Sequence, residues 1–364
     1  MQVRTIYIDD DDKELRKYQK KFEEDERSKN NFKVVSINPQ KPNLNDLLKE
    51  IKKKKFDLIL IDFDLSKPKN DLLLGTSGAG LSAVLKENYP DIPLILFTRK
   101  SVFKVDKFPP RILSSLDGFL YKTELFKENS EKLVFLNEIS LGFKRLRNAR
   151  SSKFSNLLKI IDAPKTDYDL LKESNPPLDA KGNWSVSEVT QWIREVILNY
   201  PGILYDSLHA ATFVGISEHE FLTDQVQNLF EKAKYSGIFG KIDKCWWKSS
   251  LRKIAISKMN KKEKDLPIYM GFPTALKRAK NKDVEKSKCV YSGETPAEWV
   301  CYILGKPVKI KYSLIYKIDS RPKIMDSARV SFKAIRTSNE VNDELFDPLG
   351  QQMLSEIRKG KKAM

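Results

Sequence analysis

The run Phe56–Phe63, with the sequence FDLILIDF, constrains the fold of this 364-residue chain more than any other feature. Its aliphatic residues follow one another without the alternation of a strand that has one face in solvent. Uninterrupted runs of this kind are typical of strands buried on both faces, as in parallel sheets covered by helices. Asp62 stands near the end of the run, where an ionisable group is costly to bury unless it has a purpose. The run therefore predicts a central parallel strand that carries a functional carboxylate.

Strand and helix signals alternate along the first 145 residues. Short apolar runs are each followed by a segment whose apolar residues have helical spacing. Five such units predict an α/β fold with a doubly wound, five-stranded parallel sheet. The expected strands are 5–8, 32–37, 56–63, 93–97 and 118–121, and the expected helices are 13–22, 44–51, 80–87, 111–115 and 130–143.

Polar side chains stand where the expected strands end, and in such sheets ligands bind at the carboxyl ends of the strands. Several carboxylates at one point would repel one another unless a hard cation such as Mg²⁺ lay between them. A lysine and a hydroxyl beside them suit phosphoryl oxygens. The pattern predicts Mg²⁺-dependent phosphoryl transfer to an aspartate. The residues concerned are Asp9, Asp10, Asp62, Asp64, Thr98 and Lys122.

The segments IYIDDDD, FDLILIDFD, LILFTRK and GFLYK, in this order, resemble the receiver domain of two-component response regulators over residues 1–145. The resemblance implies a histidine kinase or phosphotransfer protein as the partner, and no catalysis beyond self-phosphorylation and autodephosphorylation. It also implies the individual roles: Asp62 as phosphoacceptor, Asp9, Asp10, Asp62 and Asp64 around Mg²⁺, Thr98 and Lys122 on the phosphoryl group, and Thr98 with Phe119 as the switch pair.

The chain departs from the receiver pattern at three places. The segment Ser66–Gly78 makes the connection after the acceptor aspartate around ten residues longer than in the family. Arg99 stands where the family usually has a small residue, and Thr123 replaces a proline. These departures leave open a second interpretation, a pseudo-receiver that serves as a scaffold or docking protein and never accepts phosphate.

The rest of the chain predicts a linker and an output domain. Residues 146–183 are charged and rich in turn-forming residues, and Pro176-Pro177 indicates a domain boundary. Residues 184–364 are expected to form an α+β domain, helical over 184–256 and strand-containing over 288–336. No known family is identified for this half.

Two clusters in the second half suggest what the output could be. Trp246 and Trp247 beside Lys248 and Arg252 could stack bases and hold phosphates, although a core tryptophan pair flanked by solvated lysines is the alternative. The charges of Asp319–Lys333 could form an effector active site, an interface or a solvated ion-pair lattice. The hypotheses are therefore nucleic-acid binding, protein binding with or without homodimerisation, or an effector enzyme.

Composition limits the partners and the cellular compartment that are expected for this chain. The net charge of +17 favours a polyanionic partner, but the lysines are spread along the whole chain. No apolar stretch approaches the length of a membrane span. The three cysteines are scattered and form no metal or disulfide pattern, so a reducing cytoplasm is expected.

Overall fold

The computed structural model describes residues 2–39, 44–65, 78–99, 116–128, 130–149, 153–199, 201–242, 244–318 and 324–360. These residues form two compact units. Unit 1 comprises residues 1–161, 177–190 and 237–242, and unit 2 comprises 162–176, 191–236 and 243–364. Residues 66–77 of the predicted insertion, the predicted helix 111–115, and Asp319 and Arg321 lie outside the described residues.

Unit 1 is built on a five-stranded, all-parallel sheet with the strand order β2-β1-β3-β4-β5. This order defines the flavodoxin-like doubly wound fold, so the predicted fold class is confirmed. The strands are β1 (Val3–Ile8), β2 (Phe32–Ile37), β3 (Leu58–Ile61), β4 (Leu94–Thr98) and β5 (Gly118–Tyr121). The helices are α1 (Asp12–Glu24), α2 (Leu44–Lys52), α3 (Gly78–Asn88), α5 (Lys132–Ala149) and α6 (Phe154–Ile160).

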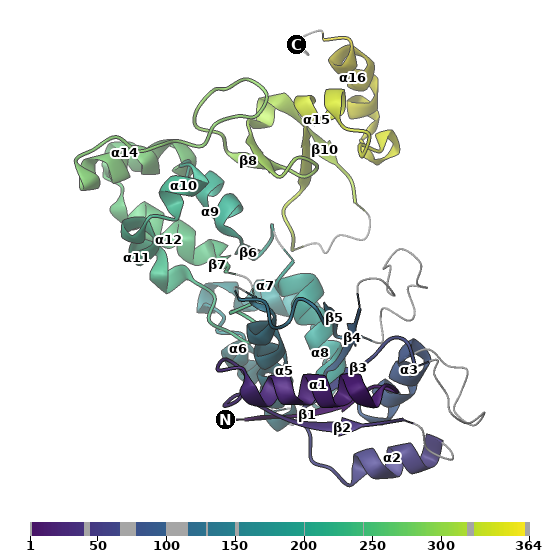
Figure 1. Cartoon of the computed structure of the whole chain (residues 1–364). Helices are drawn as coiled ribbons and strands as arrows, with labels where there is room; N and C mark the ends of the chain where they lie inside the picture. Colours follow the sequence, from purple (N-terminus) through teal and green to yellow (C-terminus); the bar gives the residue numbers. More distant parts are fainter. Residues whose placement is uncertain are drawn as a thin grey trace. The chain divides into compact units, whose positions relative to one another are not determined.

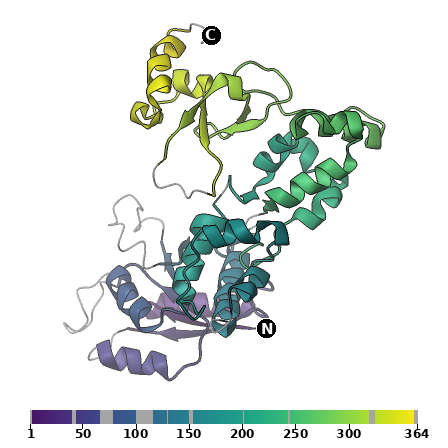
Figure 2. The ribbon, with the colours of Figure 1, turned by 180° about the vertical axis from the view of Figure 1, so that it is seen from behind.

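Helices cover both faces of the sheet, which explains its continuous apolar strands. Alternate residues of a strand point to opposite faces. Ile6 and Ile8 share a cluster with side chains of α2 and α3. Tyr7 points the other way, with its ring 6.3 Å from that of Tyr18 on α1. Figure 1 shows α1 lying along the strands, and Figure 2 gives the view from behind.

The segment predicted as a turn-rich linker is largely helical. Helix α5 continues to Ala149, α6 follows, and α7 (Tyr168–Glu173) begins after a short 3-10 turn. Leu157, Leu158 and Leu171 are buried. These leucines give the segment an apolar side that its charged residues obscured in the sequence. The domain boundaries themselves stay a prediction.

Unit 2 combines short helices with small antiparallel sheets, as expected for an α+β domain. One apolar cluster lies among the helices of residues 205–276, and a second among the strands and helices of 289–357. Helix α8 (Val186–Trp192) spans the boundary between the two units. The first part of unit 2 then contains β6 (Leu204–Tyr205), α9 (Ser207–Phe213), α10 (Glu218–Phe221), α11 (Asp224–Phe230), β7 (Trp246–Trp247), α12 (Lys248–Lys258), α13 (Lys261–Lys264) and α14 (Ile268–Lys280). The second holds β8 (Trp299–Cys301), β9 (Lys306–Val308), β10 (Ser313–Tyr316), β11 (Ala328–Ser331), α15 (Phe332–Thr337) and α16 (Pro348–Arg358).

No helix among the described residues is both long and apolar enough to cross a membrane.

Gly215 has a structural requirement that can be tested. Its φ is +81°, and a Cβ at this position would lie 1.9 Å from the carbonyl oxygen of Tyr269. We expect Gly215→Ala to lower the free energy of unfolding by about 3 kcal/mol or more, because strain and a backbone clash add. Gly305 also has a positive φ (+55°) but no atom within 4 Å of the added Cβ. Gly305→Ala should therefore cost only about 1 kcal/mol. Urea denaturation followed by tryptophan fluorescence measures both, and equal losses would contradict the role of the clash.

Candidate functional site

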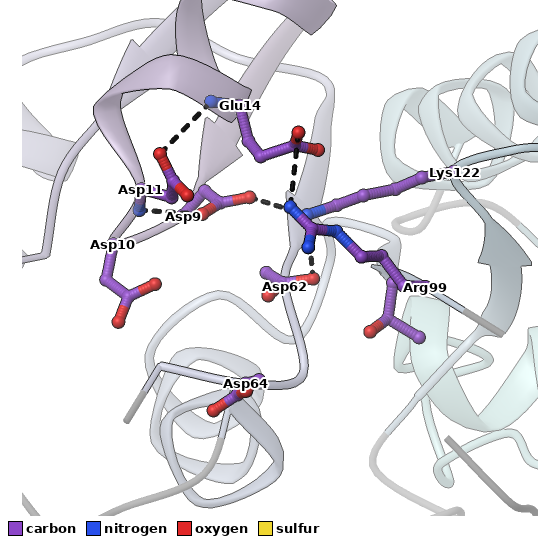
Figure 3. Close-up of a pocket in the computed structure, with 9 residues that line it drawn as sticks. Asp9, Asp10, Asp11, Glu14, Asp62, Asp64, Arg99 and Lys122 are labelled. Atoms are coloured by element: carbon purple, nitrogen blue, oxygen red, sulfur yellow. Dashed lines mark hydrogen bonds and ion pairs between the residues drawn. The ribbon is translucent and has the colours of Figure 1, made fainter. Parts of the chain in front are cut away.

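The sheet brings the predicted site residues of unit 1 to one edge. In the register of β1 and β3, Ile8 pairs with Ile61, so the next residues, Asp9 and Asp62, are neighbours. The amide of Asp62 donates to the carbonyl of Ile8 at 2.9 Å. A pocket of about 40 Å³ opens at this edge. It is lined by Asp9, Asp10, Asp11, Glu14, Asp62, Asp64, Thr98, Arg99 and Lys122. Figure 3 shows Lys122 and Arg99 reaching toward Asp9, Glu14 and Asp62 from separate elements.

A buried lysine joins the two neighbouring carboxylates. The Nζ of Lys122 lies 2.6 Å from Oδ2 of Asp9 and 2.9 Å from Oδ1 of Asp62. Lys122 follows β5, and its amide donates to the carbonyl of Thr98 at the end of β4, at 2.8 Å. Its side chain is only 2% exposed. A buried ammonium is tolerated only when it is paired, so the two carboxylates and the lysine stabilise one another.

Asp9 is more fully engaged than the sequence predicted. Its Oδ2 accepts hydrogen bonds from Lys122 and from the hydroxyl of Tyr7, and its Oδ1 accepts from the amide of Asp11 at 2.8 Å. Burial, followed by the charge of Asp9, raises the pKa of Tyr7, so the phenol stays protonated as a donor. In this structure Asp9 holds Lys122, and its role as a direct Mg²⁺ ligand stays a prediction.

Tyr7 was not among the site residues predicted from the sequence. One signal for it was available, because residues two apart in a strand point to the same face. The phenol could therefore have been placed beside the Asp9 carboxylate.

Asp62 is buried, and the nearby Lys122 offsets only part of the cost of burying its charge. Burial raises its pKa to about 6, with Lys122 opposing and Asp9 reinforcing the shift. Thr98, the last residue of β4, is close enough to Asp62 to lower this pKa, yet its buried hydroxyl completes no hydrogen bond. The unsatisfied hydroxyl beside this carboxylate favours a bound group with acceptor oxygens, because such a group would accept its hydrogen bond.

A second ion pair stands at the rim. Nη2 of Arg99 lies 3.2 Å from Oε1 of Glu14, and Lys17 donates to the same oxygen at 3.0 Å. The side chain of Arg99 is half exposed, so it borders the opening and does not fill the pocket floor. Asp11 caps α1 by accepting from the amides of Lys13 and Glu14, as expected for an acid at a helix start.

The residues present fit a divalent cation. Mg²⁺ is typically held by one or two carboxylates and completes its shell with waters and phosphate oxygens. The described residues contain no group of three or more His, Cys, Asp and Glu side chains placed to hold a metal, but Asp10 and Asp62 line the same pocket with Asp64 beside them. The under-compensated charge of Asp62 also favours a nearby cation. Together with Asp9, which lines the same pocket, these residues stay the predicted ligands.

Phe119, the predicted switch aromatic, lies on β5 and is 44% exposed. Its ring contacts Tyr121, with centroids 5.9 Å apart. The side chain is outside the pocket, so any effect on it must come through β4 and β5.

The predicted nucleic-acid contacts need correction. Trp246 and Trp247 are 0% and 2% exposed, and their rings lie in the core of unit 2. Buried rings cannot stack on bases, so the alternative of a core pair is confirmed. Lys248 forms an ion pair with Asp326 at 2.6 Å. Arg252 alone of these four residues is exposed.

No protein-family model and no curated protein matches the chain. Among solved structures, similar folds are found for response regulator TrrA of Thermotoga maritima, in complex with Mg²⁺ and BeF (20% identity, 37% of this chain and 99% of that chain, TM-score 0.27). Others are a receiver domain protein of Clostridium thermocellum (16% identity, 40% and 98%, TM-score 0.29) and NtrX of Brucella abortus (14%, 48% and 34%, TM-score 0.29). The receiver-domain neighbours match the N-terminal part of the chain. Likenesses this distant say nothing about activity, and the receiver-type fold rests on the strand order.

The pKa of Asp62 predicts a measurable dependence of stability on pH. A buried carboxyl whose pKa rises from 3.8 to about 6 on folding opposes folding once ionised. The cost is absent below pH 3.8, grows up to about pH 6 and is constant above it. Without divalent cations, Asp62→Asn should therefore stabilise unit 1 by about 1–3 kcal/mol at pH 7.5, and by little at pH 4.

Urea titrations read by hydrogen exchange of β1 and β3 peptides would measure this gain. The control is Asp46→Asn, a partly exposed carboxylate near the start of α2 that pairs with Lys49, which should change stability by less than about 0.5 kcal/mol. A destabilised Asp62→Asn at pH 7.5 would contradict the proposed burial penalty.

Proposed function

We propose that the chain is a response regulator whose unit 1 accepts a phosphoryl group on Asp62 in a Mg²⁺-dependent reaction. The observation that carries the proposal is Lys122, whose ammonium contacts both Asp9 and Asp62 at the carboxyl edge of the sheet. The unsatisfied Thr98 hydroxyl faces the same pocket. A nucleophilic carboxylate, a fixed cation and a hydroxyl donor are the parts that phosphoryl transfer to an aspartate requires.

The chemistry follows from the charges of these groups. An oxygen of the Asp62 carboxylate attacks phosphorus, the bond from phosphorus to the donor breaks, and the donor leaves with the electron pair. With a pKa of about 6, most of Asp62 is ionised and nucleophilic at neutral pH. Asp9 holds Lys122 in reach of a phosphoryl oxygen. Asp9, Asp10, Asp62 and Asp64 would hold Mg²⁺, which would neutralise charge on the phosphoryl oxygens.

The switch would act through β4 and β5. A phosphoryl oxygen on Asp62 offers the Thr98 hydroxyl the partner it lacks. Thr98 pairs with Tyr121 and Leu96 with Phe119 in the sheet register, so a shift at Thr98 reaches the strand that carries the exposed Phe119. The surface at β4 and β5 would then differ between the two states.

The partner implied by this chemistry is a histidine kinase or phosphotransfer protein. We assign the output function to unit 2 but name no target for it. The burial of Trp246 and Trp247 removes the strongest reason in the sequence for expecting nucleic-acid binding. The alternative, a pseudo-receiver that only docks a protein, differs in one respect. It would take up no phosphoryl group at Asp62.

Intact-protein mass spectrometry tests the proposal. Full-length protein is incubated with Mg²⁺ and acetyl phosphate, and we expect the mass of one phosphoryl group to be added. Asp62→Asn should add nothing, because an amide is not a nucleophile for phosphorus. Asp57 serves as the matched control, since it is a buried aspartate of unit 1 paired with Arg4 away from the pocket. Asp57→Asn should still be phosphorylated if it folds, which circular dichroism checks.

Uptake by Asp62→Asn equal to that of the wild type would refute Asp62 as the acceptor. No uptake by the wild type, together with no Mg²⁺ binding by calorimetry, would favour the pseudo-receiver.

Arg99 provides a separate test of its place at the rim. Its guanidinium borders the opening and pairs with Glu14, so its charge should attract the anionic donor. We expect Arg99→Ala to slow phosphorylation by acetyl phosphate about three- to tenfold at low salt, with a smaller difference at high salt. Arg16→Ala is the control, because it removes the same charge from the exposed side of α1. Faster phosphorylation of Arg99→Ala would show that the arginine obstructs the site.

A further inference from the structure

Unit 2 contains a second pocket that the proposed phosphoryl chemistry does not use. It has an interior volume of about 30 Å³, which is room for roughly two water-sized groups. The pocket lies where α9 approaches β8. Its lining consists of Pro201, Tyr205, His209, Thr212, Phe213, Glu298, Trp299, Val300 and Asp326.

Two polar atoms in this lining are buried without a hydrogen-bond partner. The hydroxyl of Thr212 is one, in a residue that is only 1% exposed. The other is Oε2 of Glu298, whose Oε1 accepts from the amide of Ile310 at 2.9 Å. Buried polar atoms are nearly always hydrogen-bonded in proteins. A molecule with hydrogen-bond donors in the pocket would therefore supply what these two atoms lack.

The other carboxylates around the pocket are already compensated. Asp326 accepts from the Tyr205 hydroxyl and from Lys248, the latter at 2.6 Å. Asp206 caps α9 and accepts from Nδ1 of His209 at 2.8 Å. Burial acts to raise the pKa of Asp206, but the bonds and charge of His209 outweigh it and hold this pKa below its usual value. Neither acid needs a further cation.

Glu298 differs from these two acids. Arg329 attracts it electrostatically. However, Nε and Nη2 of Arg329 donate to Ser313 and to the carbonyl of Ile310, at 2.9–3.3 Å. Glu298 therefore contributes to the pocket lining a carboxylate with one buried oxygen that completes no hydrogen bond.

The walls supply the second requirement for a cation. The aromatic side chains Phe213 and Trp299 line the pocket, and aromatic faces attract ammonium and guanidinium groups. The ring of Tyr205 lines it too, but Nζ of Lys248 already lies 5.2 Å from the centroid of that ring. We propose that this pocket binds the head of a small organic cation with N–H donors, an ammonium or guanidinium group, through Glu298, Thr212 and the aromatic wall. A ligand of this chemistry satisfies both unpartnered atoms, and the pocket volume limits it to the cationic head.

The test uses full-length protein labelled with 5-fluorotryptophan. The chain has five tryptophans, and the Trp299→Phe variant identifies the Trp299 resonance in the ¹⁹F spectrum. Methylguanidine and methylammonium are the probes, and N-methylurea is the neutral control of similar shape. We expect the Trp299 resonance to shift saturably with at least one cation, and the urea to bind at least tenfold more weakly.

Substitutions separate the site from a general effect of added cations. Glu298→Gln keeps an oxygen for the Ile310 amide but loses the charge, and we expect at least a tenfold loss of affinity for the bound cation. Thr212→Val removes the hydroxyl with little change of volume, and a smaller loss of two- to fivefold is expected. Glu344→Gln, an exposed carboxylate in the same unit, should bind as the wild type does. The remaining fluorotryptophan resonances report whether each variant is folded.

Three results would overturn the proposal. They are the absence of any saturable shift at Trp299, equal binding of N-methylurea, and unchanged affinity in a folded Glu298→Gln variant. None of them depends on phosphorylation of Asp62, so this proposal and the proposed function fail independently.

Discussion

The ion pairs of Lys122 with Asp9 and Asp62 are the interaction on which the site of unit 1 depends. Parallel pairing of β1 with β3 places two carboxylates side by side at a buried edge. Removing the shared lysine would leave both buried carboxylates without their cation, a change that typically costs about 3–5 kcal/mol. The lysine reaches this edge because β5 ends beside β4. The sheet topology therefore supplies the charge that allows both acids to be buried.

The remaining groups of the site share the work unequally. Asp9 accepts hydrogen bonds from Tyr7, Lys122 and the amide of Asp11. Thr98 lies beside Asp62 with a hydroxyl that completes no hydrogen bond. Two adjacent acids therefore have different surroundings, and the proposed function assigns the acceptor role to Asp62.

Several buried or partly buried acids of unit 2 are compensated by cations or hydroxyl groups. Asp326 is compensated by Lys248 and Tyr205, and Glu220 by Lys280. Asp167 accepts a hydrogen bond from Ser249, while burial raises its pKa. Glu298 keeps a buried oxygen without a hydrogen bond, and the proposed ligand would supply the missing donor.

The parallel sheet, the order of its elements and the proximity of Asp62, Thr98 and Lys122 could all be predicted from the amino-acid sequence. They follow from local patterns, because apolar runs define strands and the ends of parallel strands share one edge. The contacts around these residues depend on distant segments and are visible only in the folded chain. There Asp9 contacts Lys122, and Trp246 and Trp247 are buried against other rings. Glu298 and Arg329 likewise bind the backbone of Ile310, between β9 and β10. Periodicity shows which residues share a face, but distant segments decide what that face contacts.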